Sequence, residues 1–154
     1  MPALSRRGLL MAALSGPAWG QGKQAITLPA PASLAGAADA ARQLNQPLLI
    51  LVSLEGCPFC QAVRQSYLLP LQAEGLQPVV QVDMRSNRPL LDFAGQPSTH
   101  AQQIQAWRIK LAPTLLFVGP GGRELAPRLV GASLPDFYGS YLEQRLDAAR
   151  LALR

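Results

Sequence analysis

The chain has 154 residues, of which 49% are apolar and 15% are charged. This length suits one domain of ordinary size, and the apolar content excludes a chain that is disordered throughout. The formal net charge is +5, but the basic residues are scattered and not interleaved with aromatic ones, so the sequence predicts no nucleic-acid-binding surface.

The first 20 residues have the features of an export signal. Two arginines at 6–7 form a charged n-region, and residues 8–14 form a short apolar h-region. Ala18 and Gly20 offer small side chains at positions −3 and −1 for cleavage near Gln21. The arginine pair also fits a twin-arginine export motif, and an ordinary Sec signal is the alternative. The apolar run is far shorter than the roughly 20 residues needed to span a bilayer. We therefore expect residues 1–20 to be a signal peptide and the mature protein to be soluble and exported.

The next segment leads into the folded part. Residues 21–31 are predicted to be a flexible leader, in which residues 26–28 could form a short edge strand. One domain is expected over residues 32–154. Its first helix is predicted over residues 33–45, because Ser33 is a good N-cap and apolar residues follow it at helical spacing.

A strand and a helix are expected next. Residues 48–53 are continuously apolar, which is typical of a central strand buried on both faces. The following helix is predicted over residues 57–73. Pro58 is tolerated in its first turn, whereas Pro70 should bend or interrupt it. Residues 78–83 read as a second apolar strand that ends at an aspartate.

Helices and strands are also predicted in the second half of the chain, after a loop. Residues 84–99 are polar, with two prolines and a glycine, and predict a long loop. A helix is expected over residues 100–108, a strand over 114–118, a returning strand over 124–130, and a last helix over about 133–153 with a capping box at its start. The predicted order is α-β-α-β, loop, α-β-β-α around a mixed sheet.

The tetrapeptide Cys57-Pro58-Phe59-Cys60 contains the only cysteines of the chain. Two thiols at this spacing can close a small disulfide ring and reopen it. The strand before them places Cys57 at the start of the next helix, where the partial positive charge of the helix end lowers the pKa of the leading thiol. The pattern favours redox chemistry by a reactive dithiol.

Two other uses of the cysteines are less well supported. Exported domains often contain structural disulfides, but a bridge across two intervening residues closes too short a loop to contribute much stability. A zinc site would need two further ligands, and His100 is the only histidine.

Three motifs of the chain resemble the thioredoxin fold family. They are Cys57-Pro58-Phe59-Cys60 after its strand, Ala112-Pro113-Thr114 with the strand that follows, and Val130-Gly131-Ala132 before the last helix. The resemblance spans about residues 32–146. It implies an α/β thioredoxin fold, with a central mixed β-sheet flanked by helices and an insertion before the cis-proline loop.

The resemblance also implies a role for each motif residue. Cys57 would be the exposed nucleophile and Cys60 the resolving thiol that releases a mixed disulfide. Pro113 would be a cis-proline facing the pair, so that the neighbouring backbone can bind a substrate strand. The supporting residues would be those that flank the cysteines and the proline, namely Pro58, Phe59, Glu55, Ala112 and Thr114.

Three positions depart from the family pattern. Leu51 stands where cytosolic thioredoxins have a buried aspartate, and Val79 where they have the lysine that pairs with it. Gly56 replaces the usual tryptophan, which predicts a more open rim. Glu55 is the nearest carboxylate and could act through water, or could be a solvated loop residue. The Pro-Phe dipeptide is uncharged, so we expect a reduction potential on the order of −200 to −230 mV, as for glutaredoxins.

Within the family, Leu91-Asp92-Phe93-Ala94-Gly95 in the insertion is similar to exported proteins of the SoxW type, which are associated with sulfur oxidation and periplasmic thiol reduction. This implies a periplasmic reductant of exported proteins that needs no cofactor beyond the Cys57–Cys60 disulfide. Its electrons would come from a membrane thiol transporter of the DsbD kind, and we expect a monomer. A periplasmic oxidant or isomerase and a copper-binding module are the alternatives.

Three further residues carry weaker expectations. Trp107 is expected to pack in the core rather than to contact substrate. His100 is expected to be a surface residue, neither ligand nor base. Arg64 shares a helix face with Cys57 and could stabilise its thiolate, although a solvated arginine is the simpler interpretation.

Overall fold

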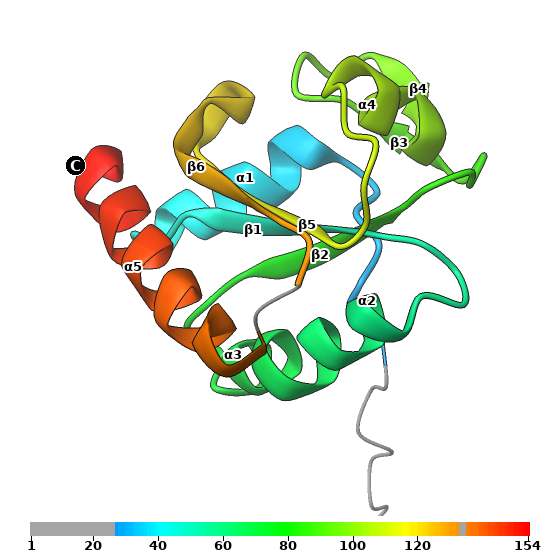
Figure 1. The fold of residues 1–154 in the computed structure, drawn as a ribbon. Coiled ribbons are helices and arrows are strands. Elements are labelled where there is room, and N and C mark those ends of the chain that lie inside the picture. The colour runs from blue at the N-terminus through cyan, green and yellow to red at the C-terminus, as the bar shows by residue number, and fades with distance from the viewer. Residues whose placement is uncertain (1–26, 133–134) are drawn as a thin grey trace, which may run out of the picture.

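The computed structural model describes residues 27–132 and 135–154. Figure 1 shows helices on both faces of one sheet, with a small hairpin beside α4. The helical segments are α1 (Leu34–Gln43), α2 (Pro58–Val63), the π-helical η1 (Arg64–Leu68), α3 (Leu69–Ala73), α4 (His100–Ala106), the short 3₁₀ turn η2 (Pro120–Gly122) and α5 (Pro135–Leu153). The strands are β1 (Leu48–Ser53), β2 (Val79–Asp83), β3 (Pro89–Leu91), β4 (Pro97–Thr99), β5 (Thr114–Val118) and β6 (Glu124–Val130).

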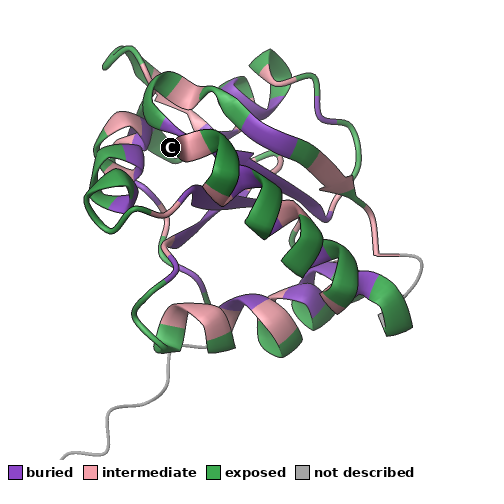
Figure 2. Cartoon of the chain, turned by 90° about the vertical axis from the view of Figure 1, so that its left-hand side faces the viewer, coloured by how far each residue is buried: buried purple, intermediate pink, exposed green. Residues whose placement is uncertain are grey.

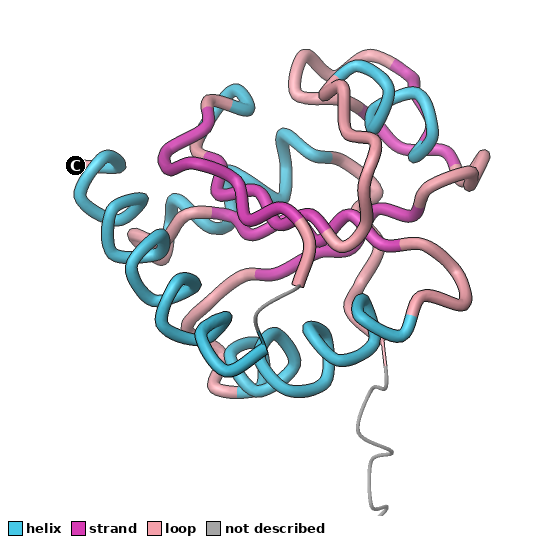
Figure 3. The backbone as a smooth tube through the Cα atoms, viewed as in Figure 1, coloured by secondary structure: helices cyan, strands magenta, loops and turns pink. Residues whose placement is uncertain are grey.

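Four of these strands form the central sheet, in the order β2-β1-β5-β6. β1 pairs parallel with β2, whereas the β1–β5 and β5–β6 pairs are antiparallel, so the sheet is mixed as predicted. The two central strands, β1 and β5, are buried along their whole length. Their continuous apolar sequences follow from this, because both faces of each strand are covered by helices (Figure 3).

Alternate residues of the strands supply two apolar cores, one on each face of the sheet. Leu49 and Leu51 of β1 face a cluster completed by α5 and the helix after the cysteines, whereas Leu48, Ile50 and Val52 face a cluster completed by α1 and α4. Figure 2 shows the result, with purple strands inside and green outer faces on the helices. The α/β layered architecture predicted from the sequence is confirmed.

The helix after the cysteines changes type along its length. It runs as α2, η1 and α3 without a gap, and Pro70 lies at the start of α3. A proline inside a regular α-helix removes a hydrogen bond and clashes with the carbonyl four residues earlier. The π-helical turn directly before Pro70 accommodates this, so the predicted interruption takes the form of a local rewinding.

The first helix begins as predicted, at a Ser33 side chain that accepts a hydrogen bond from the Gly36 N–H, at 3.1 Å. The segment before it differs from the prediction. Thr27 and Leu28 form no strand, and Ile26 lies outside the described residues. Leu28 is buried, and the carbonyl of Pro29 accepts from the N–H of Gln81 at 2.9 Å, so the described end of the leader is held against β2.

The long loop predicted over residues 84–99 is wrong, because this segment contains the hairpin β3–β4. The Asp92 carboxylate closes the turn by accepting from the N–H groups of Ala94 and Gln96, each at 2.8 Å. Gly95 adopts a φ of 76°, which glycine tolerates best. Two strands of three residues were obscured in the sequence by the prolines that begin them.

The remaining elements lie close to their predicted positions. α4, β5 and β6 occupy the predicted segments, and Trp107 ends α4 and packs partly buried against the core, as expected. α5 is described from Pro135 onward. Its expected capping residue, Ser133, lies outside the described residues.

Candidate active site

The two cysteines lie where β1 leads into the helix, as predicted. Cys57 is the N-cap of α2, and its sulfur accepts a hydrogen bond from the N–H of Cys60 at 3.1 Å. The pair forms a disulfide with Cα atoms 5.3 Å apart. Cys60 is fully buried, whereas Cys57 is only partly buried. One sulfur can therefore be reached from outside and the other cannot.

The loop before β5 is held directly against Cys57. The Ala112–Pro113 peptide bond is cis, and the carbonyl oxygen of Ala112 lies 4.0 Å from the Cys57 sulfur. The buried hydroxyl of Thr114 donates to the carbonyl of Leu111 at 2.6 Å, and the N–H of Gly131 donates to the carbonyl of Pro113 at 2.7 Å. These bonds fix the loop from both sides, so residues far apart in sequence form one site.

Exposed apolar side chains surround this site. Phe59 is 58% exposed, Leu111 is 54% exposed and Val130 is 61% exposed. Phe59 lies between the cysteines, Leu111 precedes the cis peptide bond, and Val130 precedes Gly131, which is bonded to Pro113. We call these three residues the apolar rim. Large exposed apolar groups gathered around a reactive group are typical of a protein-binding surface.

A cleft of about 900 Å³ opens on the other side of Cys57. Glu55, Cys57 and Pro58 line it from the motif, and Arg64 and Gln81 line it from the neighbouring helix and strand. Glu55 is exposed at this wall, as expected for either of its two predicted roles. Phe59 lies outside the cleft lining, in the apolar rim.

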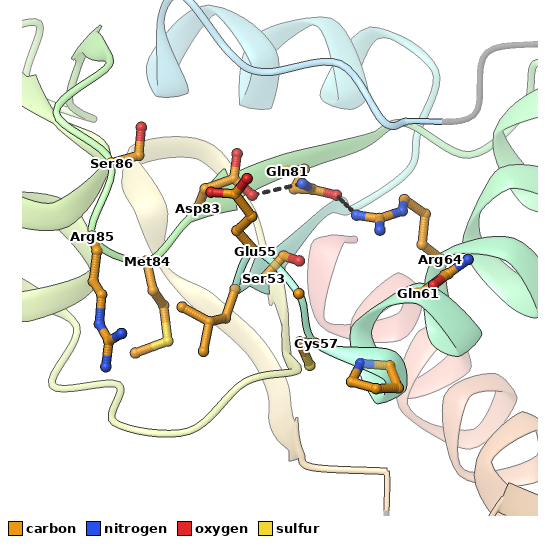
Figure 4. Close-up of a pocket in the computed structure, with 13 residues that line it drawn as sticks. Ser53, Glu55, Cys57, Gln61, Arg64, Gln81, Asp83, Met84, Arg85 and Ser86 are labelled. Carbon is orange, nitrogen blue, oxygen red and sulfur yellow. Dashed lines mark hydrogen bonds between the residues drawn. The ribbon is translucent and has the colours of Figure 1, made fainter.

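A chain of hydrogen bonds follows one wall of the cleft (Figure 4). Arg64 donates from Nη1 to Oε1 of Gln81 at 2.7 Å, and Gln81 donates from Nε2 to Oδ1 of Asp83 at 2.6 Å. The guanidinium of Arg64 is thus engaged with Gln81, and its Nε is buried without a hydrogen-bond partner among the described residues. These hydrogen bonds were not predicted from the sequence. The feature that could have indicated them is a pair of polar residues two apart in an apolar strand, because that spacing places Gln81 and Asp83 on one face.

The expectation that His100 is a surface residue is wrong. Its side chain is fully buried, and its Nδ1 accepts from the backbone N–H of Asp83 at 3.0 Å. Burial lowers the pKa of His100 below the ordinary value of 6.5; the Asp83 carboxylate opposes this and Arg88 adds to it. A neutral imidazole is required, because a protonated Nδ1 could not accept that hydrogen bond. His100 therefore joins α4 to the end of β2.

Two of the three positions that depart from the thioredoxin pattern lie in the apolar core. Leu51 is fully buried and Val79 is 2% exposed, and both belong to the cluster that also contains Val63 of α2. Leu51 lies opposite Gln81 in the β1–β2 register. The acid–lysine pair of that pattern is therefore replaced by hydrocarbon.

Comparison with known families identifies the chain. A family model described as a thioredoxin-like domain matches residues 34–146. The chain belongs to the thioredoxin-like family. Its fold and its Cys57–Cys60 disulfide are those of a thioredoxin-like thiol–disulfide oxidoreductase. Comparison with curated proteins finds no match.

Two solved structures with TM-scores above 0.5 share this fold. The chain is 19% identical to DsbH oxidoreductase, with 89% of this chain and 96% of that one covered and a TM-score of 0.51. A thioredoxin-fold protein from Helicobacter pylori is 13% identical, covering 70% and 73% of the two chains at a TM-score of 0.54. The periplasmic thioredoxin SoxS from Paracoccus pantotrophus is 24% identical, with coverage of 68% and 99% and a TM-score of 0.46.

A helix that crosses a bilayer is about 20 residues long and predominantly apolar. None of the helices in residues 27–132 and 135–154 is both long and apolar enough to cross a bilayer.

Proposed function

We propose that this thioredoxin-like protein is a periplasmic reductant, which transfers electrons from its Cys57–Cys60 dithiol to disulfides of other exported proteins. The observation that carries the proposal is the pairing of one accessible and one buried sulfur beside the Ala112–Pro113 cis peptide. The accessible sulfur also caps a helix, where the N-terminal partial charge favours a thiolate.

The reaction has two steps. The thiolate of Cys57 attacks a substrate disulfide, forming a mixed disulfide and releasing one substrate thiolate. The thiol of Cys60 loses its proton and attacks the Cys57 sulfur, which forms the internal disulfide and releases the second substrate thiolate. Two electrons pass from the protein to the substrate, and each released thiolate takes up a proton from solvent.

The neighbouring residues would bind the substrate chain. Ala112 is partly exposed beside Cys57, and the cis peptide at Pro113 would leave its backbone free to pair with an extended substrate segment. Phe59 in the apolar rim would contact side chains on either side of the substrate cysteine. Thr114 is buried and would act only by holding the loop, whereas Pro58 and Glu55 would contact substrate from the cleft.

Export and electron supply are parts of the same proposal. The signal-like residues 1–20 support delivery to the periplasm. A membrane thiol transporter of the DsbD kind would then re-reduce the disulfide, and the protein would act as a monomer of the SoxW type, with no further cofactor.

Trapping tests the proposal. In a Cys60→Ser variant purified from its native compartment, the mixed disulfide on Cys57 cannot be resolved, so partner proteins should stay attached and be released by dithiothreitol. We expect exported cysteine-containing proteins and a membrane thiol reductase, identified by mass spectrometry. The Cys57→Ser/Cys60→Ser variant is the matched control and should trap nothing.

Two outcomes would overturn the proposed direction or chemistry. Capture of a membrane oxidase of the DsbB kind alone would make the protein an oxidant. A lack of trapped partners, together with tight Cu(I) binding by the wild-type dithiol, would favour a copper-binding module.

A further inference from the structure

We propose that a second hollow beside the cysteines binds an acidic segment of the protein whose disulfide is exchanged. This hollow, of about 630 Å³, lies between the end of β2 and α4. Its walls include the apolar side chains of Met84, Ile104 and Ile109, and its charged residues are Arg85, Arg108 and Lys110. We call it the basic groove. The inference rests on the proposed function and adds the chemical class of the partner.

The charge of the basic groove is uncompensated. Arg85, Arg108 and Lys110 are exposed, and within the part of the chain that the structure describes none of them makes an ion pair. Among the described residues, no Asp or Glu lines the groove. Three free cations around an apolar wall are complementary to a segment that carries carboxylates together with an apolar side chain. Such a surface also attracts an acidic partner before contact.

The backbone at two of these cations is strained. Arg108 has a φ of 56° and Arg85 a φ of 61°, the left-handed region that glycine occupies most easily. Arg108 follows Trp107, the C-cap of α4. Its N–H donates to the carbonyl of Gln105, and the N–H of Ile109 donates to the carbonyl of Ile104. This is the helix ending at which glycine is usual. An arginine there costs stability, which is typical of positions that serve a ligand.

The basic groove is continuous with the site of reaction. Met84 and Arg85 line both the groove and the cleft that contains Cys57. At its other end, Lys110 lies two residues before Ala112, whose carbonyl is 4.0 Å from the Cys57 sulfur. A segment in the groove can therefore belong to the same chain as a disulfide at Cys57. This continuity favours a segment of the reacting protein over a free anion.

Two pairs of synthetic peptide disulfides test the inference. The members of a pair share one sequence, except that one has acidic residues on one side of its cysteine where the other has the matching amides. In the first pair these residues precede the cysteine, and in the second pair they follow it. We expect the wild-type protein to reduce one acidic peptide with a kcat/KM about tenfold above its amide partner at low salt, with the preference shrinking toward unity near 0.5 M salt.

Variants without the positive charges of the basic groove test whether the preference for acidic peptides arises there. The Arg108→Gly/Lys110→Gln variant should lose most of the preference, so that the acid-to-amide ratio falls to about two or less. Its Tm should not fall, because glycine relieves the left-handed arginine. Arg108→Gln/Lys110→Gln provides a second test should the first variant fold poorly. The matched control is Arg123→Gln/Arg154→Gln, which removes two charges near the C-terminus, away from α4 (Figure 1), and should retain the ratio.

The outcomes separate this inference from the proposed function. Equal rates for the acidic and amide peptides in both pairs, a ratio that survives in the groove variants, or an equal loss in the control would overturn the groove. If no peptide is reduced, the proposed function fails instead. Binding of fluorescent, cysteine-free versions of the peptides to the oxidised protein then decides the groove alone: a preference for the acidic peptide supports it, and its absence overturns it.

Discussion

Burial of His100 couples the charge of one side chain to the stability of the fold. The folded protein binds a proton on His100 more weakly than the unfolded chain does, because burial lowers the pKa of the imidazole. Protonation therefore favours unfolding. The stability that depends on neutral His100 is complete above the ordinary pKa of about 6.5 and is lost as the pH falls toward the lowered pKa.

We predict that the free energy of unfolding decreases as the pH falls below about 6.5, by up to about 1.4 kcal/mol per pH unit for this one proton. A His100→Asn variant keeps an acceptor near the N–H of Asp83 but does not titrate. Its unfolding free energy should be lower overall, since the smaller side chain leaves a cavity, but flatter with pH over this range. Urea unfolding at several pH values measures both slopes, and equal slopes would contradict the assignment.

The case of His100 also shows why part of the site could not be predicted. The reactive pair and Pro113 are visible in the sequence because their spacing and neighbours are local features. A buried polar side chain usually has a hydrogen-bond partner, and the partner of the His100 Nδ1 is a backbone N–H on another element, 17 residues away. The link between Arg64 and Gln81 depends in the same way on how η1 lies beside β2.

At the scale of elements, the turn of the β3–β4 hairpin packs against η2 through the side chain of Phe93. A Cβ atom added to Gly122 would lie 2.5 Å from the Phe93 ring, and the φ of Gly122 is 79°. The neighbouring Gly121 has a φ of 70° and nothing within 4 Å of its own added Cβ. Both glycines thus have left-handed backbone angles, and only Gly122 lies too close to another side chain to accept a Cβ atom.

We predict that Gly122→Ala lowers the free energy of unfolding by about 3 kcal/mol, from left-handed strain and overpacking together. Gly121→Ala should lower it by about 1 kcal/mol, from strain alone. Chemical denaturation of both variants tests the difference. The Phe93→Ala background should bring the two effects close together, and a difference that survives there would contradict the contact.

The elements themselves were predictable to different degrees. β1 and β5 were evident because apolar runs bounded by turn residues have few other interpretations. The hairpin β3–β4 was missed because three-residue strands carry too little alternation to detect, and Pro89 and Pro97 suggested a loop. Its stability comes from the Asp92 turn and the packing of Phe93, which are contacts rather than patterns.

At the scale of the whole molecule, the reduction potential measures how much the fold prefers the disulfide to the dithiol. No charged residue lies between the cysteines, and Leu51 and Val79 place hydrocarbon where thioredoxins have an ion pair. The remaining influence is the helix N-terminus, which stabilises the Cys57 thiolate. These features favour a potential between those of the strongest reductants and oxidants of the family.

We predict a potential of about −200 to −230 mV, within the range of glutaredoxins. Equilibration with glutathione buffers of known composition, followed by counting of free thiols, measures it. A value above about −150 mV would contradict the prediction and would fit an oxidant better than a reductant.

The two edge strands of the central sheet bear on whether the protein aggregates at high concentration. An open sheet has two border strands whose free backbone groups can recruit strands from other molecules. Beside β2, the carbonyl of Pro29 already occupies the N–H of Gln81. On the opposite border, β6 contains Pro127, which has no N–H to offer, and the ion pair of Glu124 with Arg128. Both edge strands are thus partly unavailable for pairing, and this protects the domain against the strand-to-strand association that leads to aggregation.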